Sequence, residues 1–108
     1  MDFQKVIHRA VEIRGKYSEM ELKKYGKEWN REQIMEGFVG DVGDLMKLVM
    51  GKSGIRKIED VDKKLAHELS DCLWCVMVLA EKYGVNLEKT FMESMDELEK
   101  KIIAEKEI

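Results

Sequence analysis

Residues 37–50 read GFVGDVGDLMKLVM, a largely apolar stretch that also contains three glycines and two aspartates. On a helical wheel of about 100° per residue, Asp41 lies in the middle of the apolar face and Asp44 lies about 60° to one side. The residues within about 60° of Asp41 are Ile34, Gly37, Phe38, Leu45 and Leu48. A carboxylate that faces a core is very costly unless it has a partner. The stretch therefore predicts a core-facing helix that also carries a site.

The glycines of this stretch also need a reason, since each costs about 1 kcal/mol relative to alanine inside a helix. Gly37 and Gly40 flank the acidic side of the predicted helix. Because they have no side chain, they leave room for a neighbouring helix or for a phosphate group. Both interpretations stay open.

Three more helices are expected around this one, and no convincing strand. The first covers about residues 2–25, and Gly26 ends it. Asn30 caps the helix that contains the opening stretch, and Gln33 completes a capping box. These short-range signals predict that only a short turn joins the first two helices.

The second half of the chain is divided by similar signals. Gly51 is expected to stop the second helix, Asp60 to cap a third that reaches Tyr83, and Asn86 to cap a fourth. Four long helices joined mostly by short loops predict an all-α fold, a four-helix antiparallel bundle in one domain covering residues 1–108.

Composition excludes several classes of function. Hydrophobic residues make up 44% and charged residues 38% of the chain, which is typical of a folded protein with a core. The net charge of −3 leaves no basic stripe for a nucleic acid. No apolar run approaches the roughly 20 residues that span a bilayer, so no membrane partner is expected. The first residues lack a secretory apolar region, which favours the cytoplasm.

The third predicted helix carries a second acidic pair, Glu68 and Asp71, followed by the uncharged run CLWCVMVLA at residues 72–80. Both acids border its apolar face. Cys72 and Cys75 have the spacing of a redox motif, but they lie in the middle of the helix. We therefore interpret them as small buried thiols rather than as redox or zinc ligands.

Two acidic pairs on the core-facing arcs of adjacent predicted helices allow two interpretations. With 22 acidic residues in the chain, single pairs at this spacing arise by chance, and lysines such as Lys64 could neutralise some charge in a structural network. Alternatively, Asp41, Asp44, Glu68 and Asp71 converge on a cation. Hard oxygen ligands favour Mg²⁺, with Mn²⁺ as an alternative. The residues alone leave the two interpretations equally open.

The segments GFVGDVGDL and HELSDCLWCVMVLAEKYGVNLE resemble the MazG-like, all-α nucleotide pyrophosphohydrolases. The resemblance covers roughly residues 29–92. It implies a Mg²⁺-dependent enzyme that splits a nucleoside triphosphate into a monophosphate and pyrophosphate, with Asp41, Asp44, Glu68 and Asp71 as metal ligands. It also implies a homodimer or homotetramer with shared sites.

Within that resemblance, Glu68 and Asp71 are the candidate catalytic residues, with Glu68 accepting the proton of the attacking water. Trp29 and Trp74 are candidates for stacking on the base, with ordinary core packing as the alternative for each. Lysines 47 and 64 are candidates for contacting the phosphates. No P-loop pattern occurs, so cleavage is expected between the α- and β-phosphates rather than at the γ-phosphate.

Two departures from the family pattern leave an alternative function. The first acidic pair is normally two glutamates, and both are aspartates here. In the fourth helix, Ser94, Leu98 and Glu99 stand where related enzymes usually offer lysine, asparagine and arginine to the phosphates. The alternative is a catalytically weakened protein that binds metal or nucleotide, or serves as a dimeric interaction module. A di-iron carboxylate bundle is not expected, because neither His8 nor His67 follows a glutamate by three residues.

Apolar faces beyond the acidic one favour self-association. The second predicted helix has a second apolar stripe, and the third is apolar nearly all round over residues 72–80. One small bundle cannot cover both surfaces. The members of that stripe are Met35, Val39, Met46 and Met50.

Overall fold

The structure, a computed structural model, describes residues 2–106. Four helices make up the described chain: α1 (Phe3–Tyr25), α2 (Arg31–Lys52), α3 (Val61–Lys82) and α4 (Leu87–Lys106). These residues contain no strand. The expected all-α fold of four helices is confirmed.

The boundaries of the first two helices follow from local chemistry. Asp2 caps α1 with a side-chain hydrogen bond, and Gly26 ends it in a left-handed conformation at φ 80°. At the start of α2, Asn30 and Gln33 form the expected capping box. The N–H of Gln33 donates to the Asn30 side chain at 2.8 Å, and the N–H of Asn30 donates to the Gln33 side chain at 2.9 Å.

Two boundary predictions, at Gly51 and at Asp60, are corrected by the structure. Gly51 does not stop α2, which continues to Lys52. A Cβ at Gly51 would lie 2.8 Å from Cδ1 of Ile58 and 3.2 Å from Cγ2 of Val61. Glycine suits this position because the following loop and the start of α3 pack against α2, so that a larger residue would displace the Ile58 side chain. Asp60 does occupy the position before α3, but at φ 54° its side chain makes no capping hydrogen bond.

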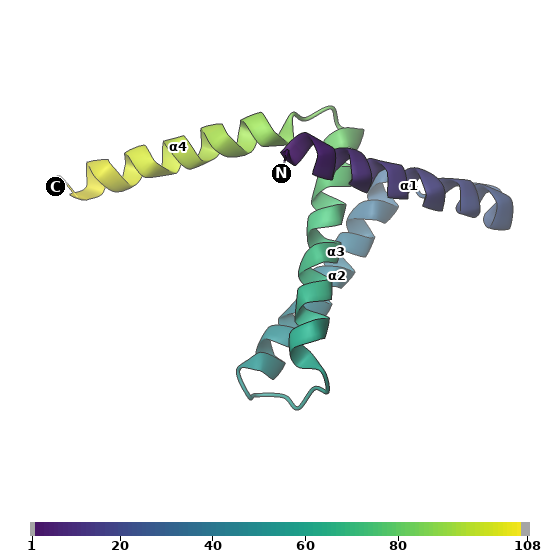
Figure 1. Cartoon of the computed structure of the whole chain (residues 1–108), viewed down its shortest axis with the longest axis horizontal. Coiled ribbons are helices and arrows are strands. Elements are labelled where there is room, and N and C mark those ends of the chain that lie inside the picture. The colour runs from purple at the N-terminus through teal and green to yellow at the C-terminus, as the bar shows by residue number, and fades with distance from the viewer. Residues whose placement is uncertain (1, 107–108) are drawn as a thin grey trace.

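The helices form an antiparallel pair, a crossing helix and an arm (Figure 1). α2 and α3 run side by side in opposite directions and make the most extensive packing, and α1 packs across α3 near the end where α3 finishes. α4 extends away from the other three helices on the side opposite α1. The radius of gyration is 17.5 Å, compared with about 13 Å for a compact chain of this length.

The core of the described chain is correspondingly small. No side chain is completely buried, and the buried apolar residues are Ala10, Ile34, Leu48, Met77 and Val78. Many large apolar side chains on α2 and α4 are exposed instead. Within residues 2–106, none of the helices is long and apolar enough to cross a membrane.

Candidate active site

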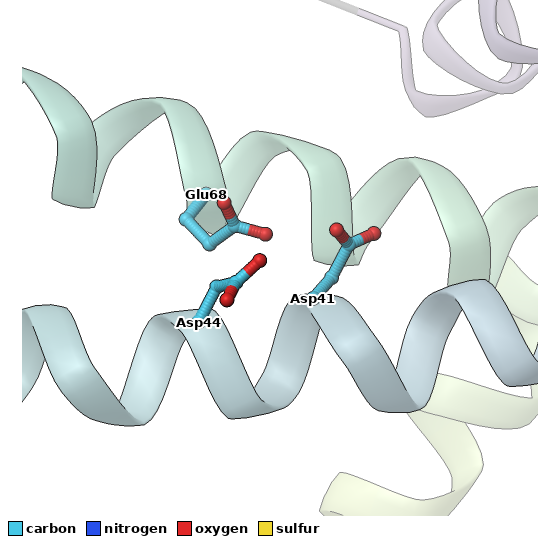
Figure 2. Close-up of side chains that lie close together, drawn as sticks. All are labelled: Asp41, Asp44 and Glu68. Carbon is cyan, nitrogen blue, oxygen red and sulfur yellow. The ribbon is translucent and has the colours of Figure 1, made fainter.

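Three of the four predicted metal ligands come together between α2 and α3 (Figure 2). Asp41 and Asp44 project from one side of α2, and Glu68 projects toward them from α3. One carboxylate oxygen of each lies within 4.8 Å of the others. Asp41 and Glu68 are half-buried and Asp44 is exposed. We call these three residues the acidic cluster.

The acidic cluster holds more negative charge than its surroundings neutralise. The pKa of Glu68 is raised to about 7, first by burial and then by hydrogen bonding to Asp41 and by the charges of Asp41, Asp71 and Asp44. Glu68 Oε1 is buried and has no hydrogen-bond partner among the described residues. A cation or a proton is needed to relieve this crowding.

The fourth predicted ligand, Asp71, lies outside the acidic cluster. Its Oδ2 is 3.2 Å from Nε2 of His67, one turn earlier on α3. It is still close enough to raise the pKa of Glu68. Asp71 therefore borders the acidic cluster, with His67 as its partner.

The two cysteines are free, half-buried and in the middle of α3. The Cys75 thiol lies 3.5 Å from Asp41 Oδ2 and donates to it. Burial, followed by this contact with Asp41, raises the pKa of Cys75 to about 12, and burial also raises that of Cys72. Both thiols therefore stay protonated near neutral pH, which does not suit a redox nucleophile.

A cavity of about 390 Å³ lies on one side of the acidic cluster and brings both tryptophans together. Its walls include three aromatic side chains, Tyr17, Trp29 and Trp74, and its acidic edge is formed by Asp41 and Asp71. We call it the aromatic pocket. Such a mixture of ring faces and a few polar groups is typical of small-molecule sites.

Two of the aromatic side chains are fixed by contacts with each other and with α1. The Trp74 Nε1–H donates to the carbonyl of Ala10 at 2.9 Å. The Tyr17 and Trp74 ring centroids are 5.7 Å apart. Trp74 therefore has a packing role as well as a place in the pocket wall.

The third aromatic side chain explains one glycine of the opening stretch. A Cβ at Gly37 would lie 3.2 Å from Cζ3 of Trp29, so the indole lies against α2 at this point. The room at Gly37 is taken by Trp29 and not by a neighbouring helix. At Gly40, a Cβ would meet nothing within 4 Å.

A second cavity, of about 550 Å³, lies on the other side of the acidic cluster. Three acids line it, Asp44, Asp60 and Glu68, together with three lysines, Lys47, Lys63 and Lys64. We call it the lysine pocket. His67 lines both pockets, so the acidic cluster lies where the two meet.

Sequence reasoning missed three polar residues near the site. Arg14 lines the aromatic pocket and is paired with Glu21, while His67 pairs with Asp71. Arg14 and Glu21 could have been found by the criterion that identified Asp41, since both fall on the apolar face of the first helix near Ala10. For His67 the only signal was its position four residues before Asp71.

Comparisons of the chain with protein-family models, with curated proteins and with solved structures find no match.

Proposed function

We propose that the protein is a cytoplasmic, Mg²⁺-dependent nucleoside triphosphate pyrophosphohydrolase that produces a nucleoside monophosphate and pyrophosphate. One observation carries the proposal: an aromatic pocket and a lysine pocket meet at a cluster of three carboxylates. A nucleotide has the same order of parts, with a planar base at one end and a polyanionic chain at the other.

The residues of the acidic cluster suit a hard divalent cation. Asp41, Asp44 and Glu68 would hold Mg²⁺ or Mn²⁺, with Asp71 beside them as the fourth acid. The buried Glu68 Oε1 without a hydrogen-bond partner supports this fit, because a free carboxylate oxygen there is available to a cation. When bound, the metal would neutralise phosphate charge and lower the pKa of a water molecule.

The two pockets divide the remaining tasks. Trp29 and Trp74 bind the base in the aromatic pocket, where ring faces tolerate any planar heterocycle. Lys47 and Lys64 contact the terminal phosphates in the lysine pocket and offset the acidic character of the chain. This arrangement directs the α-phosphate to the boundary, where the carboxylates lie.

Glu68 is the proposed general base. Its carboxylate belongs to the acidic cluster, where the two pockets meet, and an oxygen that is not engaged with the metal would accept the proton of the attacking water. Asp71, which borders the acidic cluster and the aromatic pocket, is the second candidate catalytic residue.

We further propose that the working form is a homodimer or homotetramer. The support is the exposed apolar surface, because soluble monomers rarely leave so many large side chains uncovered. On α2, Met35, Val39 and Met46 are exposed, and on α4 the stripe consists of Phe91, Met95, Leu98 and Ile102. A second copy covering these stripes would supply the core that one chain lacks.

Product analysis tests the activity. Purified protein is incubated with Mg²⁺ or Mn²⁺ and a panel of nucleoside triphosphates, and the products are separated by ion exchange. The proposal expects a monophosphate and pyrophosphate that appear together and only with the metal. Orthophosphate as the sole product contradicts it.

A nucleotide- or metal-binding protein without turnover is the second candidate, and the placement of α4 favours it. Among the described residues, none from α4 lines either pocket at the acidic cluster, so its lysines do not reach the site within one chain. Nucleotide binding by calorimetry without release of any product would select this candidate.

A further inference from the structure

α1 carries a buried ion pair whose partners lie seven residues apart on the same face of the helix. Arg14 Nη2 donates to Glu21 Oε1, and the two residues are only 8% and 5% exposed. Another ion pair on the same helix, Arg9 with Glu12, has side chains that are 67% and 54% exposed. The chain thus offers a buried pair and an exposed pair in one element.

The buried carboxylate holds the backbone of the turn between α1 and α2. Glu21 Oε1 accepts a second hydrogen bond, from the backbone N–H of Trp29 at 2.9 Å. Burial would raise the pKa of Glu21, but the hydrogen bond from Trp29 and the ion pair with Arg14 outweigh it and hold the pKa below its ordinary value. The carboxylate is therefore ionised at neutral pH and holds the backbone N–H of Trp29 in place.

The guanidinium of the same pair lies against two walls of the aromatic pocket. Arg14 Cζ is 5.8 Å from the ring centroid of Trp29 and 6.0 Å from that of Tyr17, both within cation–π range. The indole also lies near Gly37 of α2, where a Cβ would come within 3.2 Å of its Cζ3. Trp29 is thus held at its backbone by Glu21 and at its ring by Arg14.

Stability is a weak explanation for such a pair. Replacing a buried ion pair by apolar side chains of similar volume is often neutral or stabilising, because two charges must be desolvated. Apolar side chains, however, cannot accept the hydrogen bond from the Trp29 N–H. They also cannot make the cation–π contact that Arg14 makes with the Trp29 ring. The pair is better suited to setting the position of one side chain.

We infer that Arg14 and Glu21 are positioning residues that fix Trp29 as a wall of the aromatic pocket and thereby set the affinity for the base of the bound nucleotide. The effect on nucleotide affinity rests on the proposed function. The effect on the indole of Trp29 does not, so the two can be tested separately.

The position of Trp29 is tested by ¹⁹F NMR of the full chain labelled with 5-fluorotryptophan. The chain contains two tryptophans, so two signals are expected, assigned with Trp29→Phe. Glu21→Gln should shift or broaden the Trp29 signal and leave the Trp74 signal unchanged. Glu12→Gln, in the exposed pair, should change neither. A Trp29 signal that is the same in Glu21→Gln and in the parent protein overturns the inference.

A second variant guards against loss of folding. Arg14→Lys keeps the charge but loses the planar group that lies against the rings. It should therefore shift the Trp29 signal less than Glu21→Gln does, with helical circular dichroism unchanged. If Glu21→Gln fails to fold, an Arg14→Lys protein with an unperturbed Trp29 signal contradicts the positioning role.

Kinetics test the link to the nucleotide. Glu21→Gln should raise KM on the order of tenfold and leave kcat nearly unchanged, because it removes binding that is shared by ground state and transition state. An unchanged KM together with a displaced Trp29 signal would overturn the nucleotide part of the inference. Absence of turnover in the parent protein would instead overturn the pyrophosphohydrolase proposal, and the NMR result would still decide the positioning role.

Discussion

At the scale of single residues, the acidic cluster is an unfavourable arrangement that the fold maintains. Asp41, Asp44 and Glu68 repel one another, and the pKa of Glu68 reflects this by rising to about 7. Residues chosen for stability alone would relieve such crowding, whereas the proposed cation site would make use of it. Raising the pH should therefore lower the free energy of unfolding of the metal-free protein. Adding the metal should raise it.

The first prediction concerns pH. The pKa of Glu68 is about 7 in the folded protein and about 4.5 in the unfolded chain, so the folded state binds the extra proton between these values. The free energy of unfolding of the metal-free protein should thus fall by about 1–3 kcal/mol as pH rises from 5 to 8. Urea titrations with chelator at a fixed protein concentration measure it. Glu68→Gln should flatten the dependence, and an unchanged slope in that variant would contradict the assignment.

The second prediction concerns metal affinity. Asp41→Asn should weaken Mn²⁺ binding by tenfold or more, because it removes a charged ligand from the acidic cluster. The same change should leave the metal-free protein as stable or more stable, since it relieves repulsion with Glu68. Calorimetric titration and urea unfolding measure the two effects. Glu36→Gln, an exposed acid on α2, is the control, and equal Mn²⁺ affinity in both variants would argue against the site.

The helical wheel predicted where Asp41 and Asp44 point, because side-chain direction on a helix is fixed by the backbone. It could not predict that Asp71 turns to His67, since rotamers depend on neighbours that the wheel does not contain. The same limit applies to Arg14 and its contact with Trp29, which joins residues on both sides of a turn.

At the scale of helices, local signals predicted the boundaries that depend on a few adjacent residues. Gly26 and the capping box of Asn30 and Gln33 act within one turn, so their sequence pattern is sufficient. Gly51 acts through Ile58 and the start of α3, contacts that the local pattern does not encode. The local pattern therefore predicts a helix stop at Gly51, whereas α2 continues to Lys52.

The third prediction uses this difference between glycines. Gly51→Ala should destabilise the protein by about 1 kcal/mol, because the new Cβ would displace Ile58 Cδ1, at 2.8 Å, and crowd Val61 Cγ2, at 3.2 Å. Gly15→Ala, in the interior of α1 with nothing within 4 Å of its Cβ, should stabilise by about 0.5–1 kcal/mol. Urea unfolding of both variants measures the effects. Equal changes of the same sign would show that Gly51 is not a packing glycine.

At the scale of the whole molecule, a small core and an extended α4 leave much apolar surface uncovered in one chain, which supports the proposed oligomer. The 17.5 Å radius of gyration and the absence of completely buried side chains leave too little apolar burial in one described chain. The all-α class was predictable from the periodicity of the apolar residues. The position of α4, away from the other three helices, was not, because an apolar stripe does not reveal which surface packs against it.

The fourth prediction is therefore an oligomer at micromolar concentration. Light scattering should give at least twice the 12.6 kDa of one chain. Leu98→Lys, within the exposed apolar stripe of α4, should lower the mass or shift the dissociation to higher concentration. Glu97→Lys, on the other side of α4, serves as the control. A 12.6 kDa species for the parent protein would refute self-association.

The most direct test of the account is the position at which water attacks the nucleotide. Hydrolysis is carried out in H₂¹⁸O with Mg²⁺, and the products are analysed by mass spectrometry. Because the carboxylates lie where the aromatic and lysine pockets meet, we predict that ¹⁸O enters the nucleoside monophosphate and that pyrophosphate stays unlabelled. Label in pyrophosphate or orthophosphate, or no turnover with any nucleoside triphosphate, would contradict the account.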